Sequence, residues 1–141
     1  MTHALKVEQD SDAFLGLFAA VRAQGERAGW LELEAPGHGA AAPVRERSAA
    51  ERTLDAGAWK AVAVERDRSV AVKSRRGPAV LRDLLREHFR GCRVVLVRGE
   101  ACLPALRARG SDWELVGADG LVRRLTTADL LRALRSPLLE L

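Results

Sequence analysis

The sequence predicts a single α+β domain with a mixed β-sheet of about five to seven strands and helices packed on it. Three observations indicate this class. Valine and alanine alternate across a hairpin at 59–73, leucines follow at helical spacing from 81, and Val94–Val97 form an unbroken apolar run. With 141 residues the chain matches one ordinary domain, so we expect residues 1–141 to fold together.

Before the hairpin the sequence predicts a strand, a helix and a second strand. Leu5–Val7 is the first strand, and Asp10 or Ser11 caps the helix. The apolar residues of this helix are Phe14, Leu17, Phe18 and Val21. Trp30–Glu34 alternate as a strand with one solvated face. Residues 35–57 are rich in Pro, Gly, Ala and mixed charge, and predict a flexible loop.

The hairpin is expected to turn through a three-residue loop, Arg66–Arg68. This register puts Val64 opposite Val70 and Val62 opposite Val72, and thus all four valines on one face. Gly77 and Pro78 then open a helix, which ends at Gly91. Its apolar face comprises Leu81, Leu84, Leu85, His88 and Phe89, which makes His88 a core histidine.

The apolar run Val94–Val97 does not alternate, which is typical of a strand that is covered on both faces. Strand, helix and strand in succession predict a right-handed parallel crossover from the second hairpin strand, 69–73, to this one. The predicted core consists of Val62, Val64, Val70, Val72, Leu81, Leu85, Val95 and Val97.

The C-terminal third continues the same domain. Pro104 with its flanking leucines predicts a short helix, and Trp113–Val116 and Leu121–Arg123 predict a second hairpin around a glycine-rich turn. A last helix is capped by Thr126 or Thr127, carries Leu130, Leu131 and Leu134, and stops at Pro137.

Charge is distributed unevenly along the chain. Residues 1–57 have 6 Lys and Arg against 9 Asp and Glu, whereas residues 58–141 have 17 against 10. Twenty of the 23 positive residues are arginine and alanine is abundant, which a GC-rich genome also produces, so the pI alone does not indicate nucleic acid. Two cysteines, no apolar run near 20 residues and no apolar leader predict a cytoplasmic protein with reduced thiols.

A basic stripe is the strongest candidate for a binding site. Its residues are Lys73, Arg75, Arg76, Arg82, Arg86 and Arg90, and three of the arginines recur every four residues along one helix. Such a stripe could contact phosphates. The alternative is a solvated helix face, because Asp83 and Glu87 lie three residues before Arg86 and Arg90, at ion-pair spacing.

The order helix, strand, hairpin, helix, strand resembles the restriction-endonuclease-like topology. In that comparison Val70–Lys73 is the strand that bears the catalytic E-x-K motif. Lys73 stands in the place of the lysine, but Ala71 replaces the metal-binding glutamate and the preceding strand offers no aspartate. The resemblance therefore implies a nuclease-like fold that cannot hold Mg²⁺.

Other catalytic or metal-binding patterns are weak, and the sequence predicts no cofactor. Glu32 and Glu34 share one strand face, which is the usual solvated face of an edge strand. His88, Cys92 and Cys102 could supply three metal ligands, but His88 falls on the leucine face of its helix.

The sequence does not assign a function by itself. The interpretation we favour is a non-enzymatic binding or assembly module that self-associates or binds a protein partner. The tail offers a contact for an oligomer, because Leu138, Leu139 and Leu141 cannot all face one core from extended backbone. Nucleic-acid binding through the basic stripe is the alternative.

Overall fold

The computed structural model describes residues 2–33, 52, 56–64, 66–73, 77–78, 80–99 and 101–136. The chain divides into two compact units, one formed by Met1–Pro36 with Leu81–Leu141 and the other by Gly37–Val80. The architecture is α+β, as predicted, with a six-stranded mixed sheet in the first unit and a two-stranded sheet in the second. The predicted flexible loop, 35–57, lies outside the described residues apart from 52, 56 and 57.

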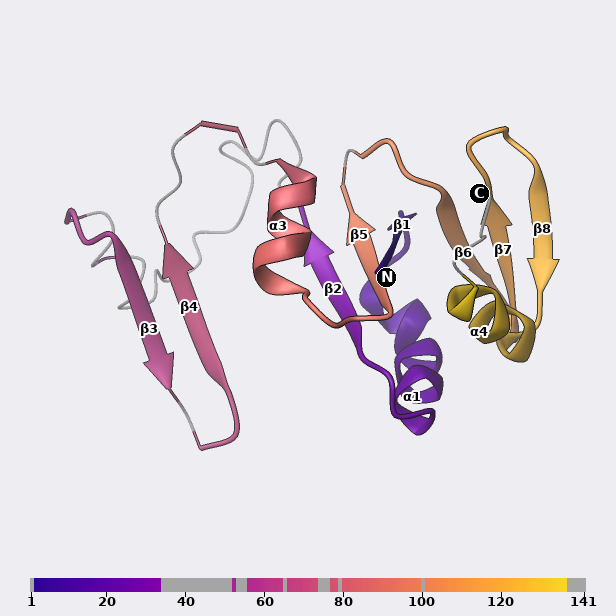
Figure 1. The fold of residues 1–141 in the computed structure, drawn as a ribbon, viewed down its shortest axis with the longest axis horizontal. Coiled ribbons are helices and arrows are strands. Elements are labelled where there is room, and N and C mark those ends of the chain that lie inside the picture. The colour runs from indigo at the N-terminus through magenta and orange to yellow at the C-terminus, as the bar shows by residue number, and fades with distance from the viewer. Residues whose placement is uncertain are drawn as a thin grey trace. The chain divides into compact units, whose positions relative to one another are not determined.

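The first unit has a sheet of strand order β2-β5-β1-β6-β7-β8 (Figure 1). Its elements in chain order are β1 (His3–Val7), a 3-10 turn (Ser11–Phe14) that leads into α1 (Leu15–Ala23), β2 (Ala28–Glu32), α3 (Leu81–His88), β5 (Val94–Arg98), β6 (Ala105–Arg109), β7 (Asp112–Val116), β8 (Val122–Leu125) and α4 (Thr127–Arg135). The second unit contains β3 (Lys60–Val64) and β4 (Ser69–Lys73).

Strand β5 is the centre of the parallel half of the sheet. It lies between β1 and β2, and Leu96 pairs with Leu5 on one side and Trp30 on the other. All four residues of the run Val94–Val97 are 0% exposed, which confirms the prediction of a strand buried on both faces. The predicted crossover from β4 is wrong, since β4 belongs to a separate sheet and the parallel neighbours are β1 and β2.

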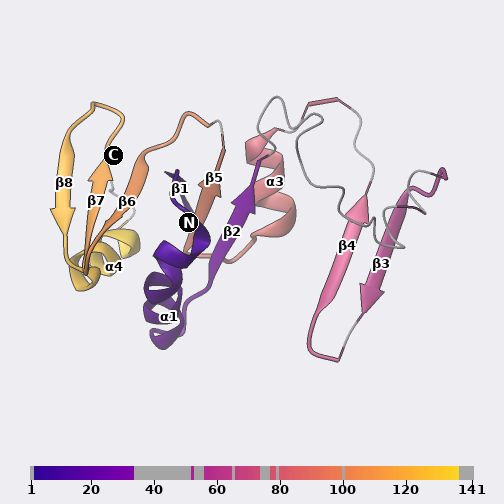
Figure 2. The same ribbon diagram turned by 180° about the vertical axis from the view of Figure 1, so that it is seen from behind.

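Helices cover both faces of this half. Figures 1 and 2 show α1 and α3 on opposite faces of β2 and β5. The main core packs α1 and α4 against one face, and it comprises Leu5, Val7, Phe14, Leu17, Val21, Val94, Leu96, Leu106, Trp113, Leu115, Leu130, Leu131 and Leu134. Val95 and Val97 point to the other face because side chains alternate along a strand, and α3 lies there with Leu84 buried.

The approach of α3 to the sheet is close at one point. A Cβ atom added to Gly29 in β2 would lie 2.4 Å from the Phe89 ring and 3.4 Å from Val95. The chain turns after α3 through Gly91, which has a φ of 85°, as the glycine at this position predicts. A glycine in β2 therefore lets the C-terminal end of α3 rest on the sheet.

The antiparallel half differs from the prediction at one element. Residues around Pro104 were expected to form a short helix, but Ala105–Arg109 form β6 and pair with β7 over five positions. Leu106 and Ala108 alternate toward the core, so pairing with β7 overrides the local pattern. The second hairpin, β7 and β8, and the helix α4 are as predicted, and the Thr126 side chain caps α4 by accepting from the Asp129 N–H at 3.2 Å.

The hairpin of the second unit is present, but its register differs by one residue from the prediction. Val62 pairs with Ala71, Ala63 with Val70 and Val64 with Ser69, whereas the prediction paired Val62 with Val72 and Val64 with Val70. Opposite residues share a face, which places Val62 and Val64 on one face and Val70 on the other. A shift of one residue between the two strands is enough to separate the valines, because each residue of β3 then pairs with the neighbour of its predicted partner in β4.

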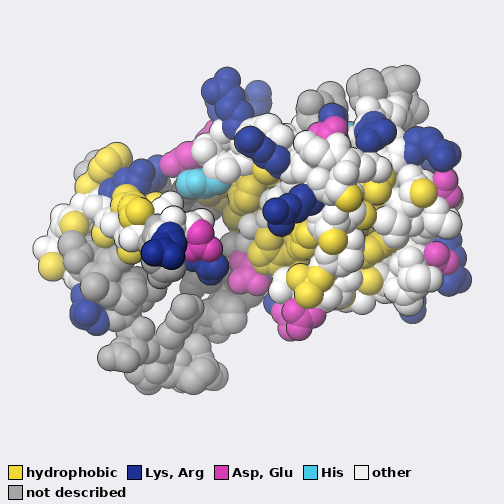
Figure 3. Space-filling view, turned by 90° about the horizontal axis from the view of Figure 1, so that it is seen from below, with side chains coloured by type: hydrophobic (Ala, Val, Ile, Leu, Met, Phe, Trp, Pro, Cys, Tyr) yellow, Lys and Arg dark blue, Asp and Glu magenta, His cyan; other side chains and the backbone are white. Residues whose placement is uncertain are grey.

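The predicted core is correspondingly wrong at the hairpin. Val62, Val64 and Val70 are 55%, 77% and 55% exposed, whereas Val95 and Val97 are buried. Leu81 and Leu85 are half-buried, and the side chain of Val72 lies outside the described residues. Apolar side chains lie at the surface of this unit, at the left of Figure 3.

The resemblance to the restriction-endonuclease-like topology does not hold for the described strands. It required Val70–Lys73 to follow the preceding strands within one sheet, but β4 pairs with β3 alone. Among the described helices, none has the length and apolar character needed to cross a bilayer.

Candidate functional site

A groove between α3 and the start of β1 is the best candidate site in the first unit. It has a volume of about 410 Å³. Its lining residues are Thr2, Leu81, Arg82, Leu85, Arg86, Arg90 and Gly91. Three of the six residues of the predicted basic stripe therefore line one cavity.

The amphipathic pattern of α3 explains which side chains reach the groove. Each residue advances by about 100° around a helix axis. Leu84 is buried against the sheet, and Arg82 and Arg86 each lie about 160° from it around the axis, on the side away from the sheet. The half-buried Leu85 lies about 60° from Arg82. Asp83 lies only about 60° from Arg86 around the helix axis. Arg82 and Arg86 line the groove, and Asp83 is not among its lining residues.

The floor and the end of the groove come from outside the helix. Thr2 precedes β1, and its hydroxyl donates to the Cys92 carbonyl at 2.7 Å. The turn at Gly91 brings Arg90 to the same end, because the chain reverses there to enter β5. The hydroxyl, a glycine backbone and the leucines Leu81 and Leu85 make the remaining surface.

The arginines of the groove are free to bind an external anion. Arg82, Arg86 and Arg90 are exposed, and none has an ion-pair or hydrogen-bond partner within the described part of the chain. The ion pairs expected with Asp83 and Glu87 are not formed, and Glu87 lies 3.9 Å from His88 instead. A guanidinium group presents five donors in a fixed fork that matches phosphate and carboxylate oxygens.

The groove can therefore bind an anionic ligand with an apolar portion. Successive arginines at i and i+4 are about 6 Å apart along the helix axis. Leu81 and Leu85 line the same cavity, so they can contact an apolar part of a ligand whose charged groups bind the arginines. Among the described lining residues, the three arginines are the charged side chains and Thr2 adds a hydroxyl group.

The other residues of the predicted site fall elsewhere. Lys73 is in β4 of the second unit, paired opposite Lys60, and Arg75 and Arg76 lie outside the described residues. The predicted oligomer contacts, Leu138, Leu139 and Leu141, are also outside the described residues.

The alternative chemistries are not assembled in the described residues. The prediction of a core histidine is wrong, since the His88 side chain is 51% exposed at the last position of α3. Glu32 lies 3.6 Å from Arg98, and Glu34 is outside the described residues. No group of three or more His, Cys, Asp or Glu side chains that could hold a metal is found in the part of the chain that is described.

The two cysteines are in different environments. Cys92 is half-buried, and burial raises the pKa of its thiol, although the charge of Arg27 opposes this effect. Cys102 is exposed. A raised pKa lowers the thiolate fraction, so Cys92 is a weaker nucleophile than a cysteine with an ordinary pKa.

Sequence reasoning missed the part of the groove that comes from β1. Thr2 carries no local signal, because only the pairing of β1 with β5 brings it beside Gly91. The arginine spacing on α3 was the signal that could be read locally. Comparisons of the chain with protein-family models, curated proteins and solved structures found no match.

Proposed function

We propose that this protein is a non-enzymatic binding module whose ligand is the phosphate backbone of a nucleic acid. The observation that carries the proposal is the groove itself. Arg82, Arg86 and Arg90 line one cavity, lack acidic partners within the described residues and are exposed. Arginines on a contiguous surface without acidic partners are the electrostatic footprint of a nucleic-acid binder.

Backbone recognition fits this groove better than base recognition. The aromatic side chains Phe14, Trp30 and Trp113 contact one another in the core on the opposite face of the sheet. None of the described residues that line the groove is aromatic, so they provide no stacking platform for single-stranded bases. Phosphate contacts by arginine require no base sequence.

Fluorescence anisotropy of labelled oligonucleotides tests the proposal. We expect the full chain to bind with an affinity that falls with salt, at a log–log slope of about −0.7 per contacted phosphate of a single strand and about −0.9 for a duplex. Changing Arg82, Arg86 and Arg90 together to Gln should reduce the slope by about 2 for a single strand, because three contacts are lost.

A second triple variant removes the same net charge from other surfaces. Its substitutions are Arg22→Gln, Arg123→Gln and Arg132→Gln, all at exposed positions away from the groove. Equal losses in both variants would show that only net charge matters. Binding no tighter than about millimolar at 50 mM salt would overturn the proposal. Equal competition by inorganic phosphate would show that the ligand is a small anion and not a polymer.

A second candidate function is self-association, and the exposed apolar side chains of the hairpin favour it. Trp59 is 72% exposed, and three valines of β3 and β4 are more than half exposed. A two-stranded sheet has little stability on its own, and a second copy could cover these side chains. Sedimentation equilibrium at tens of micromolar should then give a dimer, and a monomer after Val62→Asp with Val64→Asp. Deletion of residues 137–141 tests the predicted contribution of the tail separately.

A further inference from the structure

We infer that the bound strand continues from the groove across the part of the α3 face of the sheet that no described helix covers, where Lys6 and Arg107 contact its phosphates. This inference rests on the proposed function and extends it to a longer stretch of nucleic-acid backbone. It is carried by strand alternation and register, which place both side chains on the same face as the groove.

Strand β1 links the groove to this face. Leu5 and Val7 are buried in the main core, so the residues that alternate with them, Ala4 and Lys6, face the other way, together with Thr2 of the groove. Ala4 pairs with Val95, and Lys6 pairs with Val97. Both valines are fully buried but do not belong to the main core, so Ala4 and Lys6 lie with them on the face opposite to that core.

The direction of α3 brings Lys6 level with Arg82. Phe89 lies against Gly29, which pairs with Val95 in the same row as Ala4, so the C-terminal end of the helix lies at the row of Ala4. Its eight residues extend about 12 Å toward the row of Lys6, and Thr2 to Lys6 spans roughly 13 Å in extended backbone. The groove arginines Arg82, Arg86 and Arg90 therefore lie beside β1 over the same length.

Strand β6 extends the positive surface. Lys6 pairs with Ala105, so Ala105, Arg107 and Arg109 share its face, and the core residues Leu106 and Ala108 alternate with them. Ala4 and Ala105 have small side chains, so they project little from this part of the sheet. No helix within the described residues packs on it beyond α3, since α1 and α4 pack on the opposite face.

Charge complementarity identifies the ligand of this surface. Lys6 and Arg107 have no ion-pair partner among the described residues, whereas Arg109 lies 3.1 Å from Glu114 and Arg124 lies 3.4 Å from Asp112. Pairing places Arg124, Asp112 and Glu114 on the face of Arg107. Among the described residues of β1, β6, β7 and β8, this face thus has the cations Lys6, Arg107, Arg109 and Arg124 against the carboxylates Asp112 and Glu114. Cations along such a track can neutralise successive phosphates of a nucleic-acid backbone, and these contacts need no base stacking.

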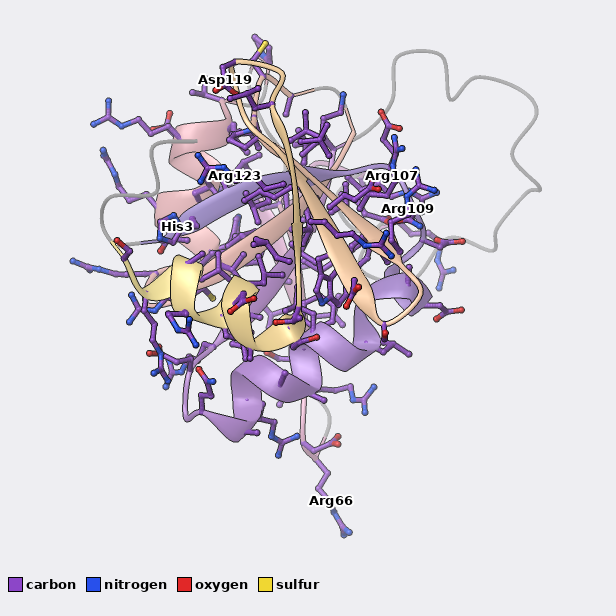
Figure 4. The ribbon with its side chains drawn as sticks, turned by 90° about the vertical axis from the view of Figure 1, so that its right-hand side faces the viewer. His3, Arg66, Arg107, Arg109, Asp119 and Arg123 are labelled. Atoms are coloured by element: carbon purple, nitrogen blue, oxygen red, sulfur yellow. The ribbon has the colours of Figure 1, made fainter. Side chains whose placement is uncertain are left out.

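Arg123 provides a matched control on the opposite face. It lies in β8 opposite Leu115, which is a core residue, and it is exposed without a partner in the described chain. Figure 4 shows Arg107 and Arg109 on one side of the sheet and Arg123 on the other side, with α4. The same substitution at Arg107 and Arg123 changes net charge equally and differs only in the face.

The experiment compares oligonucleotides of two lengths by anisotropy. Lys6→Glu and Arg107→Glu should each weaken binding of a strand of about 20 nucleotides by about tenfold or more, and each should lower the salt slope by at least about 0.7. Arg123→Glu should change affinity by less than about threefold. A strand of about 4 nucleotides fills only the groove, so Lys6→Glu and Arg107→Glu should affect it much less.

The outcomes separate this inference from the proposed function. If the unmodified chain binds neither length, the proposed function fails. If it binds through Arg82, Arg86 and Arg90, but Arg107→Glu and Arg123→Glu have equal effects on the long strand, the proposed function is supported. The inference that the ligand continues over Lys6 and Arg107 is then wrong. Equal loss for the short and the long strand would also contradict the track. Thermal unfolding of each variant establishes that it is folded.

Discussion

Two valine-rich segments of similar local sequence differ sharply in side-chain burial in this protein. In β5, Val94, Val95 and Val97 are completely buried, whereas Val62, Val64 and Val70 of the hairpin are more than half exposed. β5 has a parallel strand on each side and helices on both faces, and the hairpin strands pair only with each other. Burial therefore depends on the partners that the fold supplies, and not on how apolar a strand is.

The largest expected effect is a substitution in β5. Leu96→Ala should lower the free energy of unfolding by about 2–5 kcal/mol, because Leu96 is fully buried between Leu5 and Trp30 and its removal leaves a cavity. Val62→Ala should cost less than about 0.5 kcal/mol, since that side chain is exposed. Urea unfolding of both variants checks the difference. A similar large cost for the two would remove the distinction between the regions.

A smaller effect is expected where α3 touches the sheet. Gly29→Ala should cost about 1–3 kcal/mol, because the new Cβ would lie 2.4 Å from the Phe89 ring. Gly16→Ala is the matched control: no atom lies within 4 Å of its added Cβ, and it should stabilise α1 by about 0.4–1 kcal/mol.

A double variant tests whether Phe89 is the cause of this cost. If it is, Phe89→Ala should reduce the cost of Gly29→Ala, so the two substitutions would not be additive. Additive effects would show that α3 does not rest on β2 as described.

The smallest expected effect is a pH dependence from the first strand. Burial, followed by the charge of Arg93, lowers the pKa of His3 below its ordinary value of 6.5. The unfolded chain then binds this proton more readily than the folded one, so stability is present above about pH 6.5 and is lost as the pH falls below it. His3→Gln should reduce the loss of stability between about pH 7.5 and 5.5 in urea unfolding. An unchanged loss would show that His3 does not contribute.

Much of the fold could be predicted from local patterns. The strand at Leu5–Val7, the helix with Phe14 and Leu17, and the helix capped by Thr126 form as expected, because periodicity and capping are local properties. Residues Ala105–Arg109 became a strand against their local pattern, because pairing with β7 decides their structure. The hairpin register also failed, since loop length sets it and one residue changes it.

The candidate site was only partly predictable, for the same reason. The spacing of Arg82, Arg86 and Arg90 on one helix could be read directly. Thr2 and Lys6 could not be assigned, because strand order puts β1 beside β5 and no local signal encodes that order. The expected ion pairs with Asp83 and Glu87 were chosen by spacing alone, and side-chain direction decides whether such pairs form.

Native-state hydrogen exchange tests the comparison most directly. The amide protons of Val95, Leu96 and Val97 should exchange only through global unfolding, because β5 is hydrogen-bonded on both sides and buried on both faces. Those of β3 and β4 should exchange through local opening, at least about 100-fold faster. Equal protection of the hairpin and β5 would contradict the account, and would mean that the hairpin is part of the same cooperative core.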